Sequence, residues 1–435
     1  MNKLSDRLQK LHDRITAAVT RPTADAAITC TLQLTPQTGF DMNKVFPPTY
    51  KGKDKEWEYH TEKRLSKDYP ENKEDGVVGI VILDSIQSCA NRMEDAAEDA
   101  LKRKLFALGN AAIRFKNGSV YSSFRMPHRI HDAAMRDCTI NGVDFAYTDI
   151  GKKLYGSDLE VAAKTAFQFC PCALLFGCWC SQVNNTSRGF KSGRFAINEV
   201  FAAYVSETHR TGGRMDPLKI EDKFEIEKKD EYGSPWSISK VKKTVEEAVQ
   251  EDQEGDEVRR NKKEKTSKKK ASEIGHCNIP PSMRDKTGNF LAGGVSVKWI
   301  KDRFTIHLKK TFEYATGNNE EDVLVRKYLV FLGMYLFIEK SQKYEMRSGC
   351  SLDRTGPETI FNFSTYGKFE PFELTSEEAL ELCIHASVDV QHIFQEIVGE
   401  AKPDLERVID GSKPIMPDEE ADAEVPVKAK KSKAK

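Results

Sequence analysis

Six hydrogen-bonding side chains stand where an apolar run gives way to a helical pattern. The apolar run is VVGIVIL, residues 77–83, and the side chains that follow it are Asp84, Ser85, Gln87, Ser88, Asn91 and Arg92. Backbone N–H groups at the start of a helix are unpaired and carry partial positive charge, so such a junction suits a phosphate group. Ordinary capping, with Asp84 as the N-cap and Gln87 as its reciprocal partner, is the alternative.

Helical spacing divides the polar residues of this segment between two flanks. At about 100° per residue, one flank carries Gln87, Asn91, Glu94 and Glu98, and the other carries Ser88 and Arg92. The groups in the first turns are mostly short and uncharged, whereas a merely solvated face more often uses Glu and Lys. This composition is the argument for a binding surface, although the sequence alone favours ordinary capping with a solvated face.

A second group of candidates lies in RMPHRIHDAAMRDC, residues 125–138. It contains Arg125, His128, Arg129, His131, Asp132 and Arg136. A basic loop that contacts phosphates accounts for three arginines and two histidines. The alternatives are acid–base chemistry by His131 with Asp132, and a metal held by the H-x-x-H spacing, but no second motif completes either.

Two further motifs could carry chemistry. The segment HRTGGRMDPL has two glycines that would let the backbone approach a phosphate, flanked by Arg210 and Arg214, although a plain β-turn is the alternative. Cys170, Cys172, Cys178 and Cys180 could bind zinc, but zinc sites usually space their ligands by about two to four residues at loop knuckles. In an apolar run, cysteines act as small hydrophobic residues, so core packing is favoured.

The bulk composition narrows the class of protein. The chain has 435 residues with 67 basic and 67 acidic side chains, so its zero net charge points to no partner by itself. No apolar run approaches the roughly 20 residues of a membrane helix, and the amphipathic start MNKLSDRLQKLHDRI is not a secretory signal. With ten cysteines and no export signal, we expect reduced thiols in a soluble cytoplasmic protein that contacts no membrane.

The elements that must position these residues follow from periodicity. We expect strands at 26–34, 77–83, around 112–115, at 172–180, at 194–208, and in AGGVSVKWI and RFTIHLKKTFEYAT. We expect helices after residue 85, at 158–169 and at 322–342, with an extended loop or insertion at 40–75. This order predicts an α+β fold, a ferredoxin-like (RRM-like) antiparallel sheet with helices on one face.

The motifs, in order, resemble one protein family. They are ADAAITCTLQLTPQTGF, VILDSIQSCANRMEDA, PHRIHDAAMRD, FCPCALLFGCW, SETHRTGGRMDPL, IGHCNIPP with AGGVSV, and MRSGCSL, and they span about residues 24–352. Together they resemble the CRISPR-associated Cascade backbone subunit of type I-U (I-G) systems, in the RAMP superfamily. The chain departs from that pattern in its charged insertion, its extra cysteines and Gly349, where a second basic residue is expected.

The resemblance implies an RRM-like palm with finger and thumb insertions. We expect an N-terminal helix at 1–25, a first part of the palm at 26–212 with a finger at about 36–75 and a thumb hairpin at about 205–217, and a charged, partly flexible insertion at 213–275. The second part of the palm and C-terminal helices would occupy 276–411, and a disordered acidic and Lys-rich tail 412–435.

The resemblance also implies partners. Copies would line up head to tail along one CRISPR RNA, bind its backbone whatever its sequence, and leave target DNA to be chosen by base pairing. Other Cascade subunits would join them, a large subunit and a Cas-five or Cas-six type subunit, with the Cas-three helicase-nuclease as a transient partner. The candidate RNA-binding residues are Ser85, Gln87, Ser88, Asn91, Arg92, Arg129, Arg136, Arg194, Arg210, Arg214 and Arg347.

The expected protein is a non-catalytic RNA-binding scaffold that holds no cofactor or metal. Two alternative functions stay open. Some RAMP relatives cleave RNA, so an endoribonuclease would use residues among His128, His131, Asp132 and Asp41. The second alternative is an interaction module that the four cysteines stabilise with zinc.

Overall fold

The computed structural model describes residues 3–37, 43–51, 57–69, 71, 76–156, 158–179, 191–206, 224–228, 236–241, 268–269 and 293–403. The expected thumb turn with Arg210 and Arg214, most of the charged insertion, and the tail from residue 412 lie outside the described residues. No helix in these ranges combines the length and apolar character that crossing a membrane requires.

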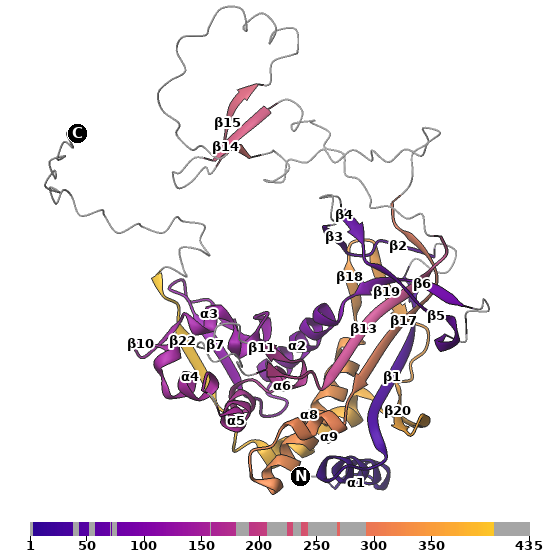
Figure 1. Cartoon of the computed structure of the whole chain (residues 1–435), viewed down its shortest axis with the longest axis vertical. Helices are drawn as coiled ribbons and strands as arrows, with labels where there is room; N and C mark the ends of the chain where they lie inside the picture. Colours follow the sequence, from indigo (N-terminus) through magenta and orange to yellow (C-terminus); the bar gives the residue numbers. More distant parts are fainter. Residues whose placement is uncertain are drawn as a thin grey trace, which may run out of the picture.

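The largest sheet of the described chain has ten strands and lies to the right in Figure 1. Its middle strands pair antiparallel in the order β20 (Ile360–Thr365), β1 (Asp25–Pro36), β17 (Val295–Ile306), β13 (Ala196–Tyr204) and β6 (Val77–Asp84). Strand β17 lies between β1 and β13, which is an order compatible with a ferredoxin-like palm. The expected α+β class and antiparallel sheet are therefore confirmed.

Four helices pack on one side of this sheet. They are α1 (Asp6–Thr20), α2 (Ile86–Lys102), α8 (Asn319–Lys340) and α9 (Ser376–Val390). Phe304 of β17 stacks on Phe337 of α8, with ring centroids 4.6 Å apart. Because side chains alternate along a strand, the neighbours Arg303 and Thr305 point to the opposite, open face.

The expected loop at 40–75 is wrong in part. Its described residues include β2 (Lys44–Val45), β3 (Thr49–Lys51), β4 (Trp57–Tyr59), β5 (Thr61–Leu65) and the 3-10 turn η2 (Ser66–Asp68). Strand β5 pairs antiparallel with β6 and closes that edge of the sheet. A second small core, with Tyr69, Phe201 and Trp299, lies on the open face near this edge.

A second sheet has five strands, four of which lie between α2 and β13 in the sequence. Its order is β10 (Val143–Asp144), β9 (Thr139–Ile140), β22 (Glu396–Glu400), β7 (Asn110–Arg114) and β8 (Val120–Ser122). The C-terminal strand β22 pairs parallel with β7, so the end of the described chain returns to this unit. Around it lie η3 (Ser123–Arg125), η4 (Arg129–His131), η5 (Phe145–Tyr147), α3 (Ala133–Arg136), α4 (Asp149–Leu154) and α5 (Leu159–Phe169).

The expected strand at 172–180 is wrong in its first half. Residues Cys172–Leu175 form the short helix α6, and only Cys178–Trp179 form a strand, β11, paired with β12 (Lys191–Ser192). An apolar run this short has no periodicity that separates a buried helical turn from a buried strand.

The remaining elements complete the edges. Strands β18 (Tyr344–Arg347), β19 (Cys350–Arg354) and β21 (Lys368–Glu373) belong to the main sheet, and η7 (Lys309–Glu313) follows β17. Strands β14 (Phe224–Lys228), β15 (Trp236–Val241) and β16 (Lys268–Lys269) pair with one another.

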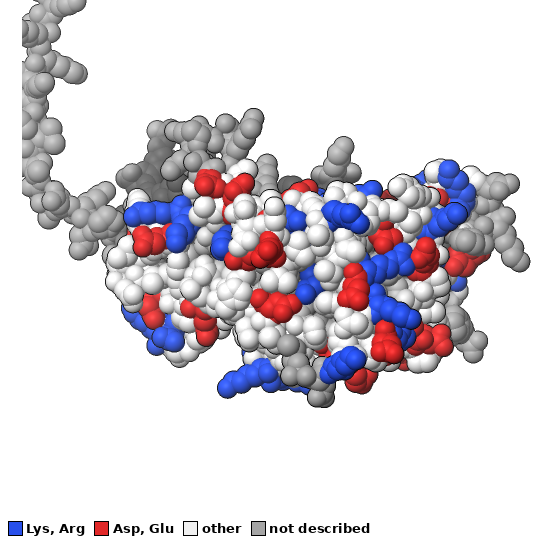
Figure 2. Space-filling view, turned by 90° about the horizontal axis from the view of Figure 1, so that it is seen from below, with Lys and Arg blue, Asp and Glu red and all other residues white. Residues whose placement is uncertain are grey.

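Charges are mixed on the face of the molecule that carries α1. Figure 2 shows Lys and Arg side chains interspersed with Asp and Glu side chains over the face seen from below. Arg14 is typical, because it bonds to Asp25 at 2.9 Å and to Glu370 at 2.6 Å. Among the described residues, this face has no broad surface of one sign.

Candidate nucleic-acid interface

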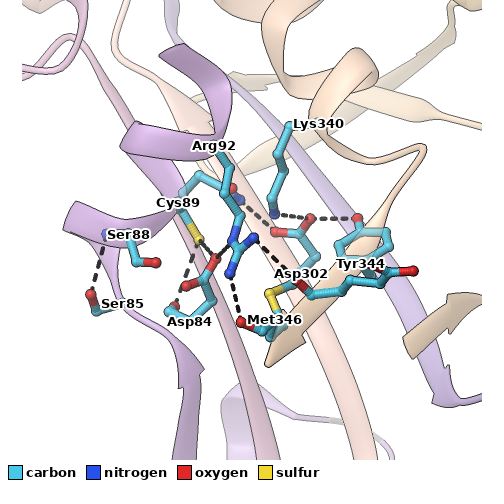
Figure 3. A network of polar contacts seen from close by, with 11 residues as sticks. Asp84, Ser85, Ser88, Cys89, Arg92, Asp302, Lys340, Tyr344 and Met346 are labelled. Atoms are coloured by element: carbon cyan, nitrogen blue, oxygen red, sulfur yellow. Dashed lines mark hydrogen bonds and ion pairs between the residues drawn. The ribbon is translucent and has the colours of Figure 1, made fainter. Parts of the chain in front are cut away.

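Ser85, not Asp84, caps helix α2. The Ser85 hydroxyl accepts a hydrogen bond from the Ser88 backbone N–H at 3.3 Å (Figure 3). The expected reciprocal cap of Asp84 and Gln87 is therefore wrong. Asp84 is the last residue of β6, and its buried carboxylate points inward to Arg92, where it accepts from Nε at 2.9 Å. The polar junction itself is confirmed.

Arg92 is occupied by contacts within the protein. Besides Asp84, it donates to the backbone carbonyl oxygens of Glu345 at 3.2 Å and Met346 at 3.0 Å (Figure 3). These bonds fasten the start of α2 to strand β18. These contacts use three of the five N–H donors of the guanidinium, so a contact between Arg92 and RNA stays a prediction that the internal bonds disfavour.

A buried network continues behind this contact. The Asp302 carboxylate accepts from Lys340 Nζ at 2.9 Å and from the Tyr344 hydroxyl at 2.6 Å, and all three side chains are buried. Burial, together with the negative charge of Asp302, raises the pKa of Tyr344, which keeps its hydroxyl a donor. The network ties β17, α8 and β18 together.

The other flank of α2 opens into a hollow of about 350 Å³, here called the junction hollow. It is lined by Ile86, Gln87, Ala90, Asn91, Pro127, His128, Arg129, Phe176, Gly177, Cys178 and Arg194. Gln87 and Asn91 are exposed and Arg194 is half-buried. Within the described part of the chain, the side chains of these three residues have no hydrogen bond or ion pair.

Arg129 forms part of the wall of this hollow. It is only 7% exposed, and its guanidinium donates to both carboxylate oxygens of Glu94, at 2.6 and 2.8 Å. A third bond, 2.7 Å long, reaches the carbonyl oxygen of Gly177 in the turn between α6 and β11. The expected contact of Arg129 with phosphate stays a prediction, which the burial of the side chain and its internal bonds disfavour.

Burial also governs the titrating groups beside the hollow. It raises the pKa of Glu94 to about 7, while Arg129 opposes that rise. It lowers the pKa of His131 to about 4. Asp132 caps helix α3, where its carboxylate accepts from the backbone N–H of Ala134 at 3.0 Å and of His128 at 3.1 Å. His131 and Asp132 are thus placed inside the fold and at a helix cap, and Asp41 lies outside the described residues.

The described cysteines of the C-x-C…C-x-C motif are core residues. Cys170, Cys172 and Cys178 are buried, and burial raises the pKa of Cys170 to about 11, so that thiol stays protonated. Cys180 lies outside the described residues. In the ranges that the structure describes, no group of three His, Cys, Asp or Glu side chains could hold a metal ion.

The structure thus divides the sequence-predicted RNA-binding residues. It brings Gln87, Asn91, Arg129 and Arg194 to one hollow. Ser85 serves as a cap, while Ser88 lies on the other flank with Arg92. Two arginines lie elsewhere, Arg136 in an ion pair with Asp137 at 2.7 Å and Arg347 donating to the Pro47 carbonyl at 2.8 Å.

A second hollow, which the sequence reasoning did not identify, adjoins the first. Its volume is about 510 Å³, and Ile86 lines both. It is lined by Lys63, Arg64, Leu65, Asp68, Tyr69, Ile86, Ile197, Glu199, Arg303 and Thr305. The alternation of polar and apolar residues in RFTI, residues 303–306, is the signal that could have placed Arg303 and Thr305 on an open face.

The junction hollow has the groups that a sugar–phosphate strand requires. The side-chain amides of Gln87 and Asn91 can donate to phosphate oxygens and accept from 2′-hydroxyls, and Arg194 supplies a positive charge. The N-terminus of α2, a helix of 17 residues, adds partial positive charge at the same place. None of these groups requires a particular base.

Part of the chain matches the sequence model of a known protein family. Residues 28–207 match the sequence model of the family described as CRISPR-associated protein GSU0053. That stretch runs from β1 through β13 and contains every residue that lines the junction hollow. No curated protein matches the chain. Over residues 28–207, the chain is therefore similar to the CRISPR-associated GSU0053 family.

Proposed function

We propose that this protein is a repeated guide-RNA-binding backbone subunit of a type I-U/I-G CRISPR surveillance complex. The observation that carries the proposal is the junction hollow, where Gln87, Asn91 and Arg194 present polar groups that no described residue bonds, beside the start of α2. The family match supports a role in a CRISPR system. The RRM-like order of the sheet fits the same conclusion.

Binding would act through the RNA backbone. Arg194 would pair with a phosphate, and the two amides with the start of α2 would fix the neighbouring sugar–phosphate unit. Because each guide has a different sequence, contacts that ignore the bases are the ones a repeated subunit needs. Selection of target DNA would then follow from pairing with the guide.

The assembly is part of the same proposal. Copies would bind head to tail along one guide, an association between unlike surfaces that can extend as a helical filament. Other Cascade subunits and, transiently, a helicase-nuclease would complete a cytoplasmic complex. Mixed charge on the face in Figure 2 is compatible with this, since RNA would be held at the hollow and other faces would meet protein.

We propose that the subunit is not an enzyme. Burial of His131 and the capping role of Asp132 favour this over the endoribonuclease alternative, while His128, at the rim of the junction hollow, is the residue that keeps the alternative testable. Incubation of the protein with guide and target RNA, with magnesium or with EDTA, is expected to leave both intact. Cleavage that is lost in EDTA or in His128→Ala would support the enzyme instead.

Binding of two unrelated guide RNAs tests the main proposal. We expect Arg194→Ala to weaken both guides equally and to reduce the slope of log K against log salt concentration by about 0.7, the value for one lost phosphate contact on a single strand. Gln87→Ala with Asn91→Ala should weaken both guides with little change in slope. Arg21→Ala, an exposed arginine after α1, is the matched control. A loss confined to one guide would show that the hollow reads bases.

A further inference from the structure

The open face of the central sheet is polar beside the second hollow. On β17, Arg303 and Thr305 alternate with the buried Phe304 and therefore share this face. Directly paired residues on β1 are Thr31, opposite Arg303, and Thr29, opposite Thr305. Since paired residues of neighbouring strands share a face, these four side chains form one patch of three hydroxyls and a guanidinium, here called the sheet patch.

Arg303 is the free charge of this patch. Its partner across the ladder to β13 is Glu199, but the Glu199 carboxylate is already bonded to Arg64 at 2.6 Å. Within the described part of the chain Arg303 has no ion pair, and its side chain is exposed. Its guanidinium carbon lies 5.5 Å from the centre of the Tyr69 ring and 5.7 Å from that of Phe201, which supports the side chain without using its N–H groups.

Lys301, two residues before Arg303 on the same strand, has a charge that is already paired. Lys301 also points to this face, but it is buried and its ammonium contacts Glu71 at 2.8 Å. Arg303 thus differs from Lys301, and from Arg64, in keeping its hydrogen-bonding groups for a ligand. A guanidinium with five N–H donors in a plane suits a phosphate particularly well.

The sheet patch adjoins the junction hollow through one residue. Ile86, the first residue of α2, lines both hollows, with Arg194 at the rim of one and Arg303 at the rim of the other. A strand bound beside the start of α2 therefore has a continuous surface leading across Ile86 onto the open face of β17. The hydroxyls of Thr31 and Thr305 offer neutral partners for ribose along that surface.

We propose that the sheet patch is a second backbone-binding subsite, in which Arg303 holds a phosphate of the same RNA strand that occupies the junction hollow. This rests on the proposed function, because it needs RNA at the hollow. A protein surface is the competing occupant, but three hydroxyls with one unpaired arginine and no exposed apolar cluster among them suit a sugar–phosphate backbone better than a protein interface.

The test compares Arg303→Ala with Arg194→Ala, the double variant and the control Arg21→Ala. Salt-dependent binding is measured with single-stranded RNAs of increasing length and unrelated sequence. We expect Arg303→Ala to weaken long RNAs about fivefold and to reduce the salt slope by about 0.7, and the double variant to reduce it by about 1.4, since each variant removes one phosphate contact. The shortest RNA that still responds to Arg194→Ala should not respond to Arg303→Ala, because it ends before the sheet patch.

Each other outcome has a definite meaning. If Arg194→Ala weakens binding while Arg303→Ala behaves like Arg21→Ala at every length, the second subsite is wrong and the proposed function stands. If wild-type protein binds RNA without salt dependence, the proposed function itself fails. If Arg303→Ala leaves RNA binding by the isolated subunit unchanged but alters self-association in size-exclusion chromatography, the patch is a protein interface and the proposal is overturned.

Discussion

Replacing Arg129 tests how the wall of the junction hollow is held. The side chain is 8% exposed and that of Glu94 is 1% exposed, so removing the guanidinium leaves a buried carboxylate without its cation. Breaking such a pair from one side costs about 3–5 kcal/mol. The carbonyl of Gly177 also loses its donor. We expect Arg129→Ala to lower the free energy of unfolding by about 4 kcal/mol, measured by urea denaturation.

The backbone at Arg129 sharpens this prediction. Its φ is +56°, a left-handed conformation that costs an L-residue about 1 kcal/mol or more and glycine almost nothing. Arg129→Gly should therefore be more stable than Arg129→Ala by about 1 kcal/mol, the reverse of the usual order for these two replacements. Because both variants lose the same hydrogen bonds, the difference between them reports the cost of the left-handed backbone at this position.

A double-mutant cycle completes the test. Glu94→Gln should cost about 3 kcal/mol, since it leaves the guanidinium buried without its counter-charge. Glu94→Leu with Arg129→Met removes both charges, so its cost should be smaller than the sum of the single costs by at least about 2 kcal/mol. If the losses in free energy of unfolding were additive, or if Arg129→Ala were within about 1 kcal/mol of wild type, the ion pair would not be what holds the wall of the hollow in place.

Three more predictions concern residues around the site. Burial lowers the pKa of His131 from an ordinary 6.5 to about 4, so as the pH falls the unfolded chain takes up a proton before the folded chain does. About 3 kcal/mol of folding stability is therefore lost between pH 6.5 and 4. His131→Asn should flatten this pH dependence of the free energy of unfolding in urea titrations, whereas His128→Asn, at an exposed position, should leave it unchanged. Arg92→Ala should lower the free energy of unfolding by about 2–3 kcal/mol, because it leaves the buried carboxylate of Asp84 without its cation. The slope of log K for RNA binding against log salt concentration should be the same for this variant and for wild type. A slope lower by about 0.7 would mean that Arg92 contacts a phosphate. Gly349 has φ +78°, and a Cβ added there would lie 2.9 Å from the ring of Phe46, whereas Gly367 has φ +79° and open space around it. Gly349→Ala should therefore lower the free energy of unfolding by at least about 1 kcal/mol more than Gly367→Ala does. Equal melting temperatures of the two variants would contradict this.

The elements beside the site could be predicted because their periodicity is strong. Strand β6 is a continuous apolar run, and helix α2 keeps apolar residues at helical spacing from Ile86 to Leu101. The same wheel placed Gln87 and Asn91 on one flank, and the structure has both at the junction hollow. Local sequence was sufficient here, since a helix wheel depends on nothing distant.

The partners of charged side chains could not be predicted, because they come from distant parts of the chain. Arg92 and Arg129 both looked like surface cations in polar segments. Arg92 reaches carbonyl groups more than 250 positions away in the sequence, and Arg129 meets Glu94 from 35 positions away. The sequence shows which residues can make ion pairs, but only the fold shows which ones use their charge internally.

Edge strands were missed for a similar reason. Strand β5, TEKRL, is almost wholly exposed and polar, so it has no alternation that marks a strand. Its pairing with β6 is decided by the free edge of that strand. Because β5 carries Lys63 and Arg64 to the second hollow, the sequence reasoning also missed that site.

Site-specific photocrosslinking tests most directly where the guide strand passes. A photoreactive residue at Asn91, exposed in the junction hollow, is compared with one at Lys10, which is exposed on helix α1. We expect position 91 to crosslink to guide RNAs of unrelated sequence with similar yield and position 10 to give no crosslink. Crosslinks from position 10 with none from position 91, or a yield at position 91 that depends on the guide sequence, would contradict the claim that this hollow holds the RNA backbone.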